Sequence, residues 1–118
     1  MPIQIQRTTN EIVSTVWTSP LRSEDVSACF GELERQIEEA DSTIHVLFDI
    51  TNAGNIPAQA PFLFFRSGMT KHPNLGRMAV IGTNPLAQIL GQMAVNMTGQ
   101  NILFFATEAD AINYLVGG

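Results

Sequence analysis

The seven residues from Ile44 to Ile50 constrain the fold more than any other stretch of the chain. They read Ile-His-Val-Leu-Phe-Asp-Ile, a nearly continuous apolar run with polar residues before and after it. Such a run is typical of a strand that is buried on both faces. Helical patterns lie on either side of it. The sequence therefore predicts a central strand in a layered α/β domain, with Asp49 near the carboxyl edge of the sheet.

Alternating or apolar segments predict the remaining strands, and capping residues predict the helices between them. The expected strands are 2–7, 11–18, 77–83 and 101–106, and the expected helices begin at Ser23, Pro61, Asn84-Pro85 and Thr107. Ser23 is expected to cap the first helix with its hydroxyl. The first two strands are expected to form an antiparallel hairpin at one edge of the sheet. All 118 residues then form a single domain.

Two of these helices carry unusual surfaces. The expected helix 61–70 contains four consecutive large apolar residues, Phe62–Phe65, which one helix face cannot bury against one sheet. It is therefore either covered from outside or exposes an apolar patch. In the helix 85–97 we expect an apolar stripe facing the core, made of Leu86, Ile89, Leu90, Met93, Ala94 and Met97.

Charge is missing from a long part of the chain. No charged residue occurs from Met78 to Thr107, and Gln88, Gln92 and Asn96 form an amide ridge along one side of the expected helix. Neutral hydrogen-bonding groups beside apolar ones are tolerated in the centre of a protein interface. The sequence predicts an interface or pocket on these two helices, with seven candidate residues: Phe62, Phe65, Met69, Gln88, Gln92, Met93 and Asn96.

Several function classes are disfavoured by composition. The net charge is −5 and the six basic residues are scattered, which argues against nucleic-acid binding. The single cysteine, Cys29, cannot close an internal disulfide and is expected to be a small core residue. Two distant histidines offer neither a metal site nor a nucleophile–base pair, so no metal, cofactor or catalytic residue is expected. We expect a cytoplasmic protein, because no signal peptide or membrane span is recognisable.

Asp49 is the one carboxylate inside the central apolar run. It is expected to accept hydrogen bonds from the amides of the following loop, which is a structural role. Two functional alternatives remain open: Asp49 holds a ligand, or it steers a phosphoacceptor. An enzyme that uses Asp49 is a further, less favoured alternative. It stays open because the sites of α/β proteins form at this edge of the sheet.

The central Val46–Ile50, the segment Arg77–Gly82 and the tail Phe105–Leu115 resemble the SpoIIAA-like group. This group is related to STAS domains, the anti-sigma-factor antagonists of bacteria, and shares a fold with SEC14-type lipid-binding domains. The resemblance covers about residues 11 to 116. It implies a mixed sheet of four to five strands with an N-terminal antiparallel hairpin and about four helices.

Phosphorylated members of the related group carry an aspartate at the end of the central strand and Asp-Ser-Ser-Gly at the next helix. Asp49 matches the first mark, but Asn55–Ala60 contains no hydroxyl. Thr51 is the nearest substitute, as a weak candidate phosphoacceptor. The leading expectation is a non-enzymatic, homodimeric regulatory module that binds an unknown protein partner. The alternative is a carrier of a small apolar ligand or lipid.

Overall fold

A computed structural model describes residues 2–82 and 84–117. Its elements follow the predicted order: β1 (Ile3–Arg7), β2 (Ile12–Thr18), α1 (Ser23–Glu39), β3 (Ile44–Asn52), α2 (Ala60–Arg66), the 3₁₀ helix η1 (Gly68–Lys71), β4 (Leu75–Ile81), α3 (Pro85–Thr98), β5 (Ile102–Phe105) and α4 (Glu108–Leu115). Thr83, which was expected to end the fourth strand, lies outside the described residues.

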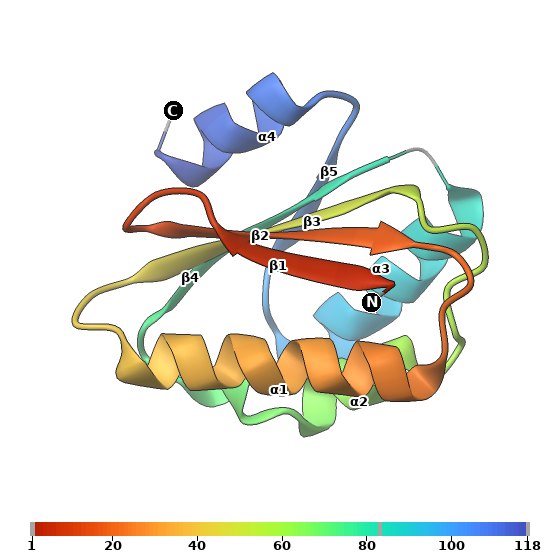
Figure 1. The fold of residues 1–118 in the computed structure, drawn as a ribbon, viewed down its shortest axis with the longest axis horizontal. Coiled ribbons are helices and arrows are strands. Elements are labelled where there is room, and N and C mark those ends of the chain that lie inside the picture. Colours follow the sequence, from red (N-terminus) through yellow and green to blue (C-terminus); the bar gives the residue numbers. More distant parts are fainter. Residues whose placement is uncertain (1, 83, 118) are drawn as a thin grey trace.

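The strands form one mixed sheet in the order β1-β2-β3-β4-β5. β1 is antiparallel to β2, and every other pair of neighbours is parallel. This confirms both the edge hairpin and the central position of β3. The order advances in one direction from β2 to β5, so right-handed crossovers place α1, α2 and α3 on the same face. Figure 1 shows these three helices on one side of the sheet and α4 on the other.

Most of the core lies between the sheet and the three helices. Trp17, Phe30, Phe48 and Phe64 meet there, with ring centroids of contacting pairs between 5.5 and 6.4 Å apart. The indole Nε1 of Trp17 donates to Thr15 Oγ1 at 2.9 Å, which satisfies both buried polar groups. A smaller apolar cluster lies under α4 and is formed by Ile12, Leu47, Ala79, Ile81, Ala111 and Leu115.

One expected helix start and one expected helix end differ in the structure. Arg22, not Ser23, is the N-cap of α1, because its backbone N–H donates to the Asp25 carboxylate at 2.9 Å. Ser23 is already helical, and its hydroxyl donates to Gln59 Oε1 at 3.3 Å. The helix expected over residues 61–70 ends at Arg66, since Ser67 adopts an extended conformation and separates α2 from η1.

The stripe of α3 expected to face the core is wrong for half of its residues. Leu86, Ile89 and Met93 are exposed, whereas the buried positions are Ala87, Leu90 and Ala94. Both sets follow helical spacing of three and four residues, so α3 carries two apolar stripes. The smaller side chains face inward because they let the helix approach the sheet closely.

Candidate binding face and apolar pocket

α2 exposes two aromatic side chains on one side. Phe62 is 56% exposed and Phe65, three residues later, is 42% exposed, while Phe64 is buried against the aromatic core. Pro61 lies in the first turn, where its missing N–H leaves no hydrogen bond unmade. The four consecutive apolar residues of α2 are thus divided between core and solvent, and the patch foreseen as one alternative is present.

α3 exposes three apolar side chains at helical spacing. Leu86 is 46%, Ile89 60% and Met93 40% exposed. The helix is fixed at its start by Asn84, whose side-chain oxygen accepts from the backbone N–H groups of Leu86 and Ala87 at 3.0 and 3.3 Å. We call Phe62, Phe65, Leu86, Ile89 and Met93 together the apolar face; the two helices that carry it pack against each other.

The predicted amide ridge accompanies this face. Gln88, Gln92 and Asn96 are exposed on α3, and Gln92 Nε2 donates to Asn96 Oδ1 at 3.1 Å. Apolar groups clustered at the surface of a soluble protein mark interaction sites, and interface centres are depleted of charge. The arrangement is suited to burying a neutral partner surface.

Met69 does not belong to this face, contrary to the expectation from the sequence. It lies in η1 with a side chain that is fully buried in the main core, and it does not line the pocket described below. The reason is the break at Ser67, which turns the chain away from the direction of α2 before Met69 is reached.

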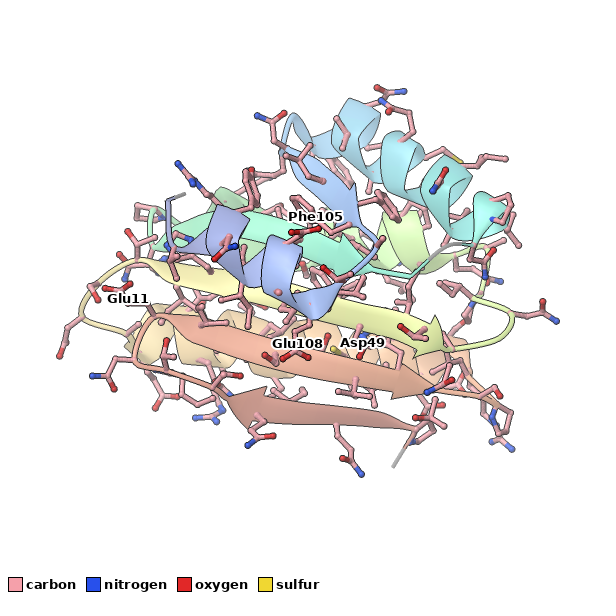
Figure 2. The ribbon with its side chains drawn as sticks, turned by 90° about the horizontal axis from the view of Figure 1, so that it is seen from above. Glu11, Asp49, Phe105 and Glu108 are labelled. Carbon is pink, nitrogen blue, oxygen red and sulfur yellow. The ribbon has the colours of Figure 1, made fainter. Side chains whose placement is uncertain are left out.

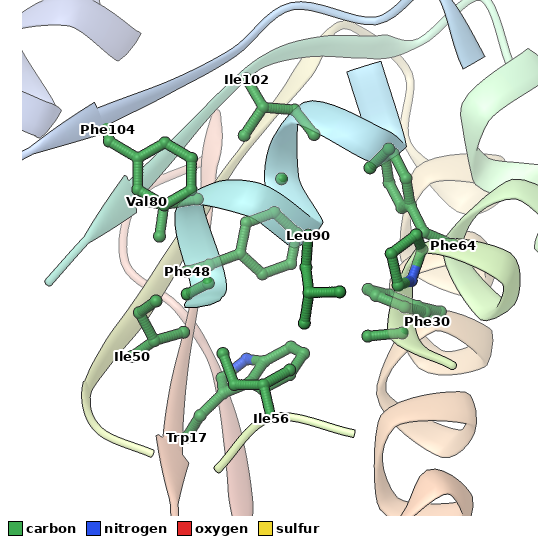
Figure 3. Close-up of a pocket in the computed structure, with 15 residues that line it drawn as sticks. Trp17, Phe30, Phe48, Ile50, Ile56, Phe64, Val80, Leu90, Ile102 and Phe104 are labelled. Atoms are coloured by element: carbon green, nitrogen blue, oxygen red, sulfur yellow. The ribbon is translucent and has the colours of Figure 1, made fainter. Parts of the chain in front are cut away.

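Beneath the apolar face lies a pocket of about 90 Å³ between α2, α3 and the sheet. Figure 3 shows side chains of both helices and of the strands pointing into it. Its lining is made of apolar residues: Trp17, Phe30, Phe48, Ile50, Ile56, Ala60, Pro61, Phe64, Val80, Ala87, Leu90, Gly91, Ala94, Ile102 and Phe104. The Trp17 indole N–H is already bonded to Thr15. The pocket can therefore accept only a hydrocarbon-like group.

The inner face of α3 explains the pocket. Ala87, Gly91 and Ala94 have little or no side chain to fill the space above the sheet. Gly91 also permits a close approach, because a Cβ there would lie 2.7 Å from the ring of Phe104. The predicted core-facing stripe included Ala94 but left out Ala87 and Gly91, although Ala87, Leu90, Gly91 and Ala94 also follow helical spacing along α3.

Asp49 accepts one backbone hydrogen bond, from a residue that was expected in the following loop but lies within β3. Its Oδ1 accepts the backbone N–H of Thr51 at 3.0 Å. Figure 2 shows Asp49 toward the carboxyl end of β3, on the side of the sheet that α4 occupies. Thr51 is exposed within the same strand. A role of Thr51 as a phosphoacceptor stays a prediction.

His45 and Cys29, two other side chains with reactive groups, have structural roles. The His45 Nδ1 accepts the backbone N–H of Arg77 at 2.9 Å, and burial lowers the pKa of this imidazole. Burial raises the pKa of the Cys29 thiol to about 12, which keeps it protonated. No cluster of three metal-ligating side chains occurs within residues 2–82 and 84–117. In the same ranges no helix is both long and apolar enough to cross a membrane.

Comparison with known proteins places the fold. No protein-family model matches this chain, and no curated protein matches it. An uncharacterized protein of the DUF3478 family with a SpoIIAA-like fold, from Shewanella loihica PV-4, has a similar structure with a TM-score of 0.67. The match covers 96% of this chain and 91% of that one at 23% identity. The anti-sigma factor antagonist SpoIIAA in its unphosphorylated form is also similar, with a TM-score of 0.73, 15% identity, and 98% and 97% covered. The chain has a SpoIIAA-like fold.

Proposed function

We propose that this chain, a SpoIIAA-like α/β domain, is a non-enzymatic regulatory module of the cytoplasm that acts by binding protein through the apolar face of α2 and α3. The observation that carries the proposal is the exposure of five large apolar side chains on two packed helices. Leaving them in water is unfavourable, at about 25 cal/mol per Å² of apolar surface. A partner that covers them recovers this free energy. The similar structure of an anti-sigma factor antagonist supports a regulatory role.

The simplest partner for this face is a second copy of the chain. The net charge of −5 makes most encounters between copies repulsive. The segment from Met78 to Thr107, which contains α3, carries no charge. Two copies therefore approach at least cost through α3, and the paired surfaces exchange apolar contacts and amide hydrogen bonds. We propose a homodimer on this basis.

Sedimentation equilibrium of the wild-type protein and three variants tests the proposal. Ile89 is 60% exposed on the apolar face and Val116 is 59% exposed at the end of α4. Ile89→Glu is expected to weaken self-association, because it buries a carboxylate without a partner. Gln92→Glu is expected to do so more mildly. Val116→Glu introduces the same charge elsewhere and should leave assembly unchanged.

A wild-type protein that stays monomeric up to high micromolar concentration would argue against the homodimer. Self-association that Ile89→Glu and Gln92→Glu leave intact would remove the apolar face from the proposal. Circular dichroism of each variant checks that folding is retained, which is expected because Ile89, Gln92 and Val116 are all exposed.

A second candidate function is carriage of a small apolar molecule, and the pocket beneath α2 and α3 favours it. Its volume of about 90 Å³ is below the ~300 Å³ of common ligand sites. A carrier would therefore have to separate the two helices on loading. Native mass spectrometry of protein purified without denaturation tests this, since a bound lipid adds several hundred daltons. A protomer whose mass equals the mass calculated from the sequence, with no such addition, argues against a carrier.

A further inference from the structure

The strand β5 is an edge of the sheet that carries no charged side chain, proline or bulge. Within residues 2–82 and 84–117 its one hydrogen-bonded neighbour in the sheet is β4, and its four residues, Ile102–Phe105, are all apolar. Edge strands are ordinarily protected from pairing by their shortness, by charged side chains, by proline or by bulges, and β5, with four residues, has the first of these devices. β5 has no charge or proline, and its pairing with β4 runs in continuous register. The opposite edge, β1, carries two glutamines and Arg7.

The backbone groups of β5 that point outward can be identified. The Phe105 carbonyl accepts from the Gly82 N–H at 3.3 Å, so the polar groups of Phe105 face β4. In a parallel pair, residues alternate between facing the neighbour and facing away. Leu103 therefore also faces β4 with its backbone, and Ile102 and Phe104 direct their N–H and C=O groups to the free edge.

This pattern is complementary to itself under a two-fold rotation. If two β5 strands meet antiparallel with Leu103 opposite its copy, Ile102 of each strand lies opposite Phe104 of the other. Both residues of each such pair present outward groups, so the two chains exchange about four main-chain hydrogen bonds. The Leu103 side chain, 45% exposed, would then contact its copy on the axis.

Two observations favour a second copy of the chain as the partner of this edge: the absence of charge around β5 and the position of α3 beside it. β5 lies inside the uncharged segment from Met78 to Thr107 of an acidic chain, so another copy meets least repulsion there. α3 contacts β5 on one side of the sheet. A two-fold axis perpendicular to the sheet keeps the two α3 helices on the same side, next to each other. A pair of four-residue strands is too small to hold a dimer, which commonly buries ~1,200 Å² or more, and α3 supplies the remaining surface.

We propose that two copies of this chain join their sheets through antiparallel pairing of β5 with β5, centred on Leu103. This inference rests on the proposed homodimer and specifies its geometry. The joined sheet runs from β1 of one copy to β1 of the other. The free edge of β5 is buried in the pairing, and the exposed residues of α3 pack beside it.

Amide hydrogen exchange measured by NMR tests the pairing at single residues. The amides of Ile102 and Phe104 should exchange slowly at concentrations that give the dimer and much faster after dilution to the monomer. The amides of Leu103 and Phe105, bonded to β4, should be protected in both states. Exchange rates of Ile102 and Phe104 that are the same in dimer and monomer would overturn the proposal.

A matched pair of variants gives a second, independent measurement. Leu103→Lys should raise the dimer dissociation constant about tenfold or more, because it opposes two like charges at the axis. Val16 is exposed to 40% on the same side of the sheet but lies on β2, so Val16→Lys should leave the constant unchanged. A dimer that Leu103→Lys leaves intact, but Ile89→Glu disrupts, refutes the β5 pairing and keeps the proposed homodimer. A wild-type monomer refutes both.

Discussion

Filling the pocket beneath α3 provides the sharpest test of the packing described above. Ala94 is buried on the inner side of α3 and lines the pocket. Ala94→Leu adds three carbon groups directed at this space. Leucine and alanine both favour helices, so the backbone preference changes little.

The expected gain follows from the apolar surface that the new side chain buries. Burying three carbon groups contributes about 2 kcal/mol, at about 0.8 kcal/mol each. Because a single side chain does not fill the space completely, we expect a stabilisation of about 1–2 kcal/mol. This corresponds to a rise in Tm of about 4–8 °C for a chain of this size.

Urea denaturation followed by tryptophan fluorescence measures the change, since Trp17 also lines the pocket. Ala109→Leu is the matched control, because Ala109 is exposed on α4 and the same atoms fill no space there. It should change the free energy of unfolding by no more than about 0.5 kcal/mol. If Ala94→Leu lowers the free energy of unfolding by about 1 kcal/mol or more, the side chain is overpacked. That result would refute the conclusion that the small residues of α3 leave room for a larger side chain at this position.

Two further predictions concern glycine and histidine. Gly31→Ala should stabilise the protein by about 0.5–1 kcal/mol, since a Cβ there meets nothing within 4 Å. Gly76→Ala should destabilise it by about 1–3 kcal/mol, because its Cβ would lie 2.4 Å from His45 Nδ1. Equal effects of the two variants in urea denaturation would contradict this contrast. Burial holds the pKa of His45 below its ordinary value of about 6.5, so the folded state binds fewer protons and stability should fall as the pH is lowered below about 6.5, through the folded-state pKa. His45→Gln should lose part of this pH dependence between pH 7.5 and 5.5, and an identical pH profile in the variant would refute the assignment to His45.

The local sequence was sufficient for the type and order of the elements along the chain. The apolar run of β3, the proline in the first turn of α2 and the Asn84-Pro85 start of α3 are local signals, and their elements appear where they were expected. Two local details failed. Arg22 caps α1 because the Asp25 side chain reaches back to its amide, and Ser67 ends α2 by turning extended, which sends Met69 into the core.

What the sequence alone determined is the fold class, the element order, the absence of charge from Met78 to Thr107 and the excess of apolar side chains on α2. Only the tertiary structure decided which stripe of α3 faces inward, because both stripes are apolar and periodic. The side with Ala87 and Ala94 was selected because small residues let the helix lie close to the sheet, and Gly91 touches Phe104 there. Strand order, likewise a non-local property, made β5 an edge. The candidate surfaces follow from these two choices.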